Sequence, residues 1–257
     1  MDDYESFKKN VLSMTGIDLS AYKERQMKRR IDTLINRQKC SGYNEFLNLL
    51  RTNNAVFEEF VSYLTINVSE FYRNPDQWDY MDKVVFPELI NKFGKRLKIW
   101  SAACSTGDEP YSLVMALSKH VPLGNISINA TDIDKQILAK ANVGLYDEKS
   151  LAGVPDEFKK KYFTQVGPSF KVSDDIKARV NFKQHNLLAD KYDTGYDMIV
   201  CRNVLIYFTE EAKDQVFRKY YASLKPGGVL FIGSTEQIMN YQDIGYIRKN
   251  SFFYEKP

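Results

Sequence analysis

The stretch IWSAACSTGDEPYS, residues 99–112, decides the fold. It begins like a buried strand with Ile99 and Trp100, runs through small residues to Gly107, and continues into a helix expected to start at Pro110. A strand, a tight loop and a helix in this order form the nucleotide-binding turn of doubly wound α/β domains. Such loops usually hold a pyrophosphate on glycine-rich backbone. Here Ala, Cys and Ser stand in place of most of the glycines, so the loop is expected to hold a different group.

Apolar runs alternate with helical stretches from residue 97 to the C-terminus, which predicts a mostly parallel, doubly wound sheet over residues 97–257. The last piece, GYIRKNSFFYEK, is expected to form an antiparallel edge. Polar, turn-rich residues 145–178 interrupt the alternation and predict an insert subdomain. The expected strands are residues 97–103, 126–134, 179–186, 196–203 and 227–233.

The first part of the chain has a different pattern. Phe7, Val11 and Met14 recur at helical spacing, as do Met27 and Ile31 in the next helix. Residues 1–74 therefore predict a small all-helical domain, and residues 75–96 a linker helix.

Composition narrows the class of protein. The 257 residues carry a net charge of +3, too small to indicate nucleic-acid binding from bulk charge. We expect no membrane insertion, because no long apolar run is present. Three widely spaced cysteines indicate free thiols in a reducing cytoplasm, and His120 and His185 do not form metal-ligand spacings with them, so no metal is expected. We expect a cytoplasmic monomer.

The acids of the opening loop indicate which ligand it holds. Asp108 and Glu109 would repel a pyrophosphate, whereas they would attract the ammonium or sulfonium charge of S-adenosylmethionine, which carries no phosphate. Asp132, which follows Gly107 by 25 residues, is placed to bind ribose hydroxyls, with Asp134 capping the next helix. Ser, Thr and Glu are also ordinary residues at a helix start, so the loop alone is equally compatible with a purely structural role.

Five motifs in the sequence resemble those of the CheR family of chemotaxis receptor methyltransferases. In order along the chain they are SAACSTGDEPYS, ATDID, HNLL, CRNVLIYF and LKPGGVLFIGSTE. The segment TINVSEFYR, residues 65–73, also resembles that family, and the resemblance covers nearly the whole chain. It implies a Rossmann-like S-adenosylmethionine-dependent methyltransferase domain after the helical domain. The implied reaction is methyl transfer to receptor glutamates, giving glutamyl 5-O-methyl esters and S-adenosylhomocysteine for sensory adaptation.

The resemblance also assigns site residues. It implies cofactor binding by Asn67, Ser69, Arg73, Glu109, Asp132, Asn186, Leu187, Arg202 and Asn203. Arg73 and Tyr207 match the pair near the reacting methyl group. A glutamate carboxylate is ionised at neutral pH and needs orientation rather than a base, which an arginine and a tyrosine hydroxyl can provide. Without the resemblance, Arg73 is interpreted as a surface arginine and Tyr207 as a core aromatic.

The helix expected at residues 20–39 is strongly basic. Residues 22–39 contain seven basic and two acidic side chains. Most charge runs of this kind are solvated faces. The resemblance favours docking of the carboxylate-rich cytoplasmic helices of a receptor. Nucleic-acid binding is not indicated, because no aromatic residues for base stacking are interleaved within the helix. The candidate docking residues are Lys23, Arg25, Lys28, Arg29, Arg30 and Arg37.

Two alternatives stay open: a methyltransferase of RNA or a small molecule, and a non-catalytic S-adenosylmethionine-binding module. Some members of the family also bind a receptor's C-terminal peptide through a β insert. The insert here, residues 162–182, contains only Gly167 where a richer glycine content is expected of that form, so we expect no such tether.

Overall fold

The computed structural model describes residues 3–67 and 69–257, which divide into two compact units. The first unit comprises Met1–Asn67 with Leu205–Gln215, and the second comprises Val68–Val204 with Val216–Pro257.

The first unit is helical, as the sequence predicts. Rings of Phe7, Phe46 and Phe60 pack with centroids 5.6 to 6.3 Å apart and form the centre of its core. Asn53 caps one of the helices by accepting a hydrogen bond from the Val56 N–H at 3.3 Å. The elements of residues 3–67 are α1 (Asp3–Thr15), the 3-10 turn η1 (Leu19–Ala21), α2 (Glu24–Arg37), α3 (Tyr43–Thr52) and α4 (Asn54–Thr65).

A segment from far along the chain also belongs to this unit. It carries the 3-10 turn η5 (Leu205–Tyr207) and the start of α11 (Glu210–Ser223). The Phe208 ring meets the Tyr22 ring edge to face at 4.9 Å, and the Thr209 N–H donates to the Ala21 carbonyl at 2.9 Å. Apolar contact and backbone pairing thus tie residues 205–215 to the loop before α2.

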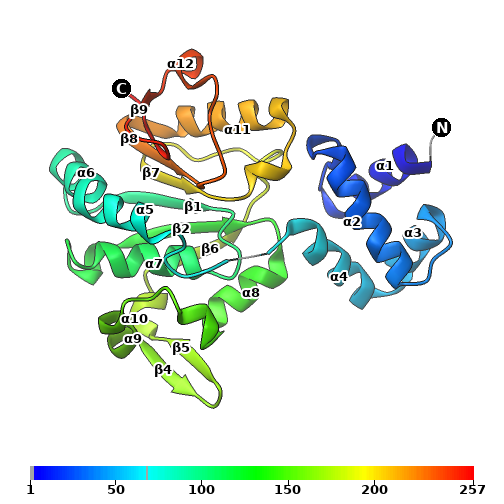
Figure 1. Ribbon diagram of the computed structural model, residues 1–257, viewed down its shortest axis with the longest axis horizontal. Helices are drawn as coiled ribbons and strands as arrows, with labels where there is room; N and C mark the ends of the chain where they lie inside the picture. The colour runs from blue at the N-terminus through cyan, green and yellow to red at the C-terminus, as the bar shows by residue number, and fades with distance from the viewer. Residues whose placement is uncertain (1–2, 68) are drawn as a thin grey trace. The chain divides into compact units, whose positions relative to one another are not determined.

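The second unit is built on a seven-stranded sheet of order β6-β2-β1-β7-β8-β10-β9 (Figure 1). The first five strands are parallel, and β10 and β9 continue the sheet antiparallel, as the sequence predicts. The strands are β1 (Lys98–Ala102), β2 (Ser127–Asp132), β6 (Val180–Gln184), β7 (Tyr196–Cys201), β8 (Leu224–Ile232), β9 (Ile247–Arg248) and β10 (Phe253–Glu255).

Successive side chains along a strand point to opposite faces of the sheet, and both faces are buried. Ile99 packs in one core with Leu113, whereas Trp100 faces the other way and meets Tyr220 at 5.5 Å. The order of strands reverses between β1 and β7, and in open α/β sheets ligands bind at the carboxyl ends of the strands at such a point. Helices α7 (Asp108–Leu117) and α8 (Lys135–Val143) contact β2 and β6. Helix α11 places Tyr220 against Trp100, and the short helix α12 (Tyr241–Ile244) contacts the edge strand β9.

Residues 75–96, expected to be a linker helix, belong to the second unit, and residues 75–93 of this segment are helical. They form α5 (Pro75–Tyr80), a π-helical segment (Met81–Val85) and α6 (Phe86–Phe93). Their apolar side is buried in the core that includes Ile99. Because Pro87 has no N–H to donate to the preceding turn, the regular helical bonding is interrupted there, beside the π-helical turn.

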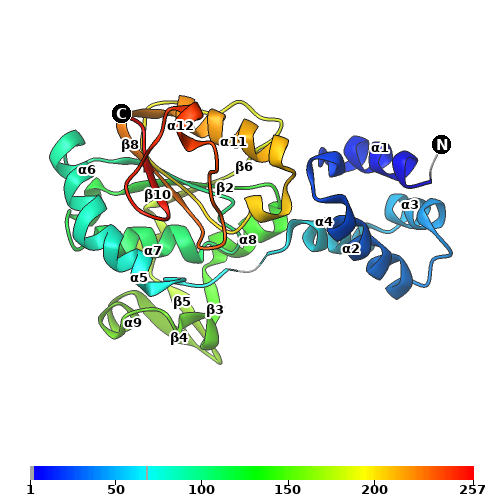
Figure 2. The same cartoon turned by 45° about the horizontal axis from the view of Figure 1, so that its top comes forward.

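The insert forms a small antiparallel sheet of order β3-β5-β4, which projects away from the large sheet in both views (Figures 1 and 2). Its elements are β3 (Leu145–Asp147), the 3-10 turn η4 (Lys149–Leu151), α9 (Asp156–Tyr162), β4 (Phe163–Val166), β5 (Ser169–Val172) and α10 (Asp174–Lys177). Throughout the described residues, no helix is long and apolar enough to span a bilayer.

Candidate functional site

The loop between β1 and α7 has an unusual backbone. Ala103, Ser105 and Gly107 all have positive φ, at 60°, 49° and 90°. Only glycine adopts this region without strain, so two non-glycine residues here must be held by their surroundings. A Cβ on Gly107 would lie 3.0 Å from that of Ala141, so this glycine also allows close packing against α8. Helix α7 begins at Asp108, two residues before the position expected from the sequence.

Asp132, at the end of β2, holds this loop. One of its carboxylate oxygens accepts a hydrogen bond from the Ser105 N–H at 2.9 Å, and the other from the Asp134 N–H at 3.0 Å. Asp134 caps α8 by accepting from the N–H groups of Gln136 and Ile137, as expected. Burial raises the pKa of the Asp132 carboxyl. The residue expected to bind ribose is thus fixed at the edge of the loop.

Glu109 lies in the first turn of α7 and is 9% exposed. The Ser101 hydroxyl donates to its Oε1 at 2.9 Å, and the Arg202 Nη1 lies 3.6 Å from its Oε2. Burial raises the pKa of Glu109, and the charge of Arg202 and the Ser101 hydrogen bond oppose that rise. A buried, oriented carboxylate at this point suits a cationic group.

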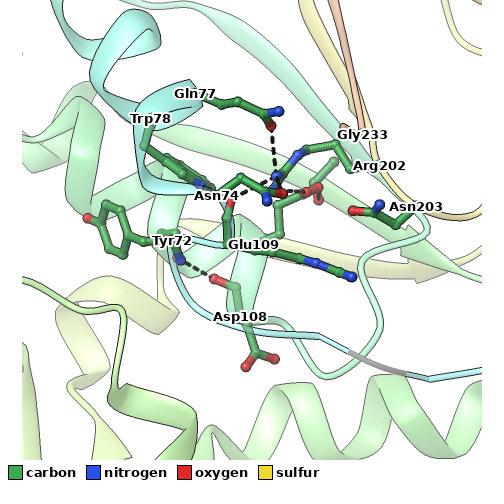
Figure 3. Close-up of polar contacts among 12 residues, drawn as sticks. Tyr72, Asn74, Gln77, Trp78, Asp108, Glu109, Arg202, Asn203 and Gly233 are labelled. Carbon is green, nitrogen blue, oxygen red and sulfur yellow. Dashed lines mark hydrogen bonds and ion pairs between the residues drawn. The ribbon is translucent and has the colours of Figure 1, made fainter. Parts of the chain in front are cut away.

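Arg202, directly after β7, joins Glu109 to the segment that contains Arg73 (Figure 3). Its Nη2 donates to the Arg73 carbonyl at 2.7 Å and to the side-chain oxygens of Asn74 and Gln77, each at 3.0 Å. Its guanidinium also lies 4.8 Å from the centre of a ring on β8, that of Phe231. Both of its Nη nitrogens therefore contact protein groups, and these contacts connect Glu109 with the segment that contains Arg73.

The Arg73 side chain is half-buried, and its carbonyl also accepts from the Trp78 Nε1 at 3.0 Å. The Ser69 hydroxyl forms a hydrogen bond with Asp108, whose pKa is raised by burial and lowered by that bond. Asp108 also accepts from the Thr106 hydroxyl at 2.5 Å. Ser69 and Arg73 therefore both lie on a segment fixed to the first turn of α7 and to Arg202.

The loop after β6 brings two more of the expected residues to this edge of the sheet. The His185 N–H donates to the Asp132 carbonyl at 2.9 Å, which sets the loop beside β2. The Asn186 Oδ1 accepts from the Leu188 N–H at 2.9 Å, and the Leu187 side chain is buried. Leu187 thus offers an apolar surface next to a polar turn.

Asn203 has a positive φ of 61° and follows Arg202 at the end of β7. Its N–H donates to the Glu236 Oε2 at 2.9 Å, and its Nδ2 donates to the Thr235 hydroxyl at 3.3 Å. Its Oδ1 is buried and without a hydrogen-bond partner among the described residues, as is the Ser105 hydroxyl. Two orphaned polar atoms on neighbouring strand ends, with the Glu109 carboxylate, fit a polar, cationic ligand.

Asn67 and Tyr207 belong to the first unit, unlike the other expected cofactor and catalytic residues. The Asn67 Nδ2 donates to the Thr65 hydroxyl at 2.9 Å. The Tyr207 side chain is half-buried, and its carbonyl accepts from the Lys23 N–H at 2.9 Å. The structure thus groups Ser69, Arg73 and Glu109 with the residues at the ends of β2, β6 and β7, and each unit fixes its own part of the set.

The basic helix α2 uses part of its charge internally. Arg37 pairs with Glu59, and the Arg30 guanidinium donates to the Tyr63 carbonyl and lies 4.4 Å from the centre of the Tyr63 ring. The Lys28 ammonium lies 5.0 Å from the Tyr4 ring, and the Lys23 side chain is half-buried. Arg25 and Arg29, by contrast, are exposed.

Sequence reasoning missed three residues that shape this site. Ser101 lies within the opening stretch and could have been found from strand alternation, because it points to the same face as Ile99. Glu236 ends the quoted motif LKPGGVLFIGSTE but received no role. Gln77 carries no signal in the sequence, since its partner Arg202 is 125 residues away. In residues 3–67 and 69–257, no group of three His, Cys, Asp or Glu side chains is placed to hold a metal ion.

A doubly wound sheet with an acidic loop at its switch point fits the class of S-adenosylmethionine-binding methyltransferases, and comparison with known families identifies that class. Residues 67–252 match the CheR methyltransferase SAM-binding domain, and residues 2–65 match the CheR methyltransferase all-alpha domain. The chain belongs to the CheR methyltransferase family, which confirms the resemblance found in the sequence.

Relatives with established names span the same length. The chemotaxis protein methyltransferase of Listeria monocytogenes is 42% identical over 254 residues, covering 99% of this chain and 97% of that protein. Chemotaxis protein methyltransferase 1 of Pseudomonas aeruginosa is 35% identical, covering 94% of this chain and 92% of that protein. Chemotaxis protein methyltransferase 2 of Vibrio cholerae is 32% identical, covering 99% and 93%.

Proposed function

We propose that this protein transfers a methyl group from S-adenosylmethionine to glutamate side chains in the cytoplasmic helical region of chemotaxis receptors. Membership of the CheR family and the names of its full-length relatives support this proposal. The observation that carries it is the buried Glu109 carboxylate, held between Ser101 and Arg202 at the carboxyl end of β1. A carboxylate there favours an amino-acid cofactor and disfavours a pyrophosphate.

The family resemblance assigns roles to the residues of the site, and the chemistry of these residues is compatible with those roles. Glu109 would hold the ammonium of S-adenosylmethionine, and Asp132 its ribose hydroxyls. Leu187 offers an apolar surface and Asn186 a polar turn for the adenine. Further polar contacts are assigned to Asn67, Ser69, Arg73, Arg202 and Asn203, with Arg202 acting through Glu109 and the Arg73 segment.

The catalytic requirement on the protein is modest. S-adenosylmethionine supplies a methyl group on a positively charged sulfur and leaves as S-adenosylhomocysteine. The glutamate carboxylate already carries the electron pair for the new C–O bond, so no general base is needed. Arg73 would orient that carboxylate by a charge-assisted hydrogen bond, and the Tyr207 hydroxyl would donate a second one. Both groups would act by aligning the nucleophile.

The test is methyl transfer from radiolabelled S-adenosylmethionine to receptor-containing membranes, followed by mild base. Release of the label as methanol identifies a carboxyl methyl ester and is the expected result. Label that resists base, or label in RNA rather than protein, would contradict the proposal. Binding of S-adenosylhomocysteine with no transfer to any of a panel of receptors would favour the non-catalytic alternative.

Tyr207→Phe gives a sharper check of the assigned chemistry. It removes only a hydroxyl, so we expect S-adenosylhomocysteine affinity to be unchanged and kcat to fall about tenfold, the effect of one lost hydrogen bond to a charged group. Calorimetry and initial rates measure the two quantities separately. An unchanged kcat would remove Tyr207 from the catalytic pair.

Receptor docking should depend on the exposed arginines of α2. Reversing the charge of Arg25 and Arg29 together should raise the KM for the receptor, most strongly at low salt, because two steering cations become repulsive. Cofactor affinity should not change. The double variant Lys95→Glu/Arg96→Glu, which reverses two exposed cations outside the helical unit, is the matched control. An equal rise in KM for both variants would show that only net charge matters.

A further inference from the structure

Glu236 makes an unusual set of contacts for a glutamate in a loop. It is 7% exposed, and its two carboxylate oxygens accept hydrogen bonds from three backbone N–H groups. Oε2 accepts from Gly233 at 2.7 Å and from Asn203 at 2.9 Å, and Oε1 accepts from Val204 at 3.1 Å. A buried carboxylate that accepts hydrogen bonds from several main-chain N–H groups holds the backbone of those residues in place.

The three donors come from two strand ends. Gly233 follows β8, and Asn203 and Val204 follow β7, its parallel neighbour in the sheet. The two turns approach closely: a Cβ on Gly233 would lie 2.7 Å from the Asn203 nitrogen, closer than side chains tolerate. Glu236 therefore links two turns that glycine allows to come together.

The linked turn carries residues assigned to cofactor binding. Arg202 and Asn203 lie in it, and Asn203 adopts its positive φ of 61° while its N–H is held by the Glu236 carboxylate. Val204 is the last residue before the chain enters Leu205–Gln215, which contains Tyr207. The segment that carries the proposed hydrogen-bond donor thus starts from a backbone position that Glu236 fixes.

We propose that Glu236 is a positioning residue for methyl transfer, whose carboxylate holds the Arg202–Val204 turn in the conformation that cofactor binding requires. The inference rests on the proposed function. A carboxylate is needed because three donors converge on it, and it has acceptor sites on both oxygens and no hydrogen of its own. A glutamine in its place would turn an NH₂ group against at least one backbone N–H.

The test compares Glu236→Gln with Asp243→Asn, which neutralises an exposed acid of the same C-terminal region. In the full-length protein, we expect Glu236→Gln to weaken S-adenosylhomocysteine binding about tenfold, because a backbone N–H left unpaired shifts the Arg202–Val204 turn out of the conformation that binds the cofactor. The KM for S-adenosylmethionine should rise, and the KM for the receptor should not. Amide NMR signals of Gly233, Asn203 and Val204 should shift in the absence of any ligand. Asp243→Asn should change none of these readings.

Each of these measurements either supports or overturns the positioning role of Glu236. Unchanged affinity and KM in Glu236→Gln would overturn the inference, as would a loss of equal size in Asp243→Asn or unshifted amide signals. If Glu236→Gln does not fold, Glu236→Asp takes its place, because it keeps the charge but shortens the side chain by one methylene and should show the same pattern in weaker form. Failure of the wild-type protein to bind S-adenosylhomocysteine would overturn the proposed function, and this inference with it.

Discussion

Replacing Arg202 by lysine should destabilise the second unit although it keeps the charge. Arg202 is 8% exposed, and its planar guanidinium reaches Glu109 with one nitrogen and three oxygen acceptors with the other. A lysine ammonium is a single point that cannot span both sides. If two hydrogen bonds of a charged group are lost, the cost is ~3 kcal/mol, with buried acceptors left unpaired.

The structure provides a direct assay for this loss. Trp78 and Trp100, the two tryptophans of the chain, both belong to the second unit. Tryptophan fluorescence in a urea titration therefore reports the free energy of unfolding of that unit. Arg96→Lys, the same substitution at an exposed position of the unit, is the control and should leave the midpoint unchanged.

The same variant separates two roles for Arg202. If it acts by holding Glu109 and the Arg73 segment, cofactor affinity should fall together with stability, and Gln77→Ala should reproduce part of both losses. A free energy of unfolding for Arg202→Lys within about 0.5 kcal/mol of the wild-type value, the range expected of surface substitutions, would refute the predicted destabilisation. A stable variant that has lost cofactor binding would instead indicate that the guanidinium contacts the cofactor directly.

Two further predictions concern β1 and the loop that follows it. Ser101→Ala removes a hydrogen bond that lowers the pKa of Glu109 while burial still raises it, so protonation should begin at a higher pH. The ionised form of Glu109 binds the ammonium, so S-adenosylhomocysteine affinity should fall as the pH is lowered. Measured by calorimetry, this fall should begin at a higher pH in the variant than in the wild type, and coincident pH profiles would contradict the prediction. Gly107→Ala should cost ~2 kcal/mol in the fluorescence titration, because it combines a strained φ of 90° with a contact of 3.0 Å. Gly167→Ala, with φ of 59° and open space around it, should cost only the strain, and an equal loss at both positions would show that packing adds nothing.

Periodicity predicted the parts of the fold that depend on neighbours in sequence. Each parallel strand was expected from an apolar run, and the last segment was expected to lie antiparallel at the edge, where β10 and β9 now lie. Asp134 could be assigned as a cap because a cap acts on the next few residues. The family motifs then assigned the acids of the loop, although motifs carry no information on which groups they contact.

What sequence could not provide are pairings between distant segments. Residues 205–215 lie in the middle of the α/β pattern, yet they fold with the helical unit, because Phe208 packs on Tyr22. The helices over residues 75–93 have one polar side, which is typical of an exposed linker. Their other side is apolar, and its burial can be recognised only in the assembled structure, where it packs in the core of the second unit. The family motif assigns Arg202 to cofactor binding, but no pattern in the sequence indicates that its guanidinium contacts groups more than 90 residues away.

Asp132 and Glu236 perform the same task on neighbouring turns, and this explains why the site can use strained backbone without glycine. Asp132 accepts the N–H of Ser105, and Glu236 accepts that of Asn203, and both of these residues have positive φ. Non-glycine residues in that region cost of order 1–3 kcal/mol each, and a charge-assisted hydrogen bond to the same residue is of similar size. Side chains such as the Ser105 hydroxyl and the Asn203 amide can therefore occupy turns where a dinucleotide-binding loop has only glycine hydrogens. A loop of bare glycine backbone suits a pyrophosphate. Polar side chains and buried acids take its place here, and they suit a cationic amino-acid cofactor.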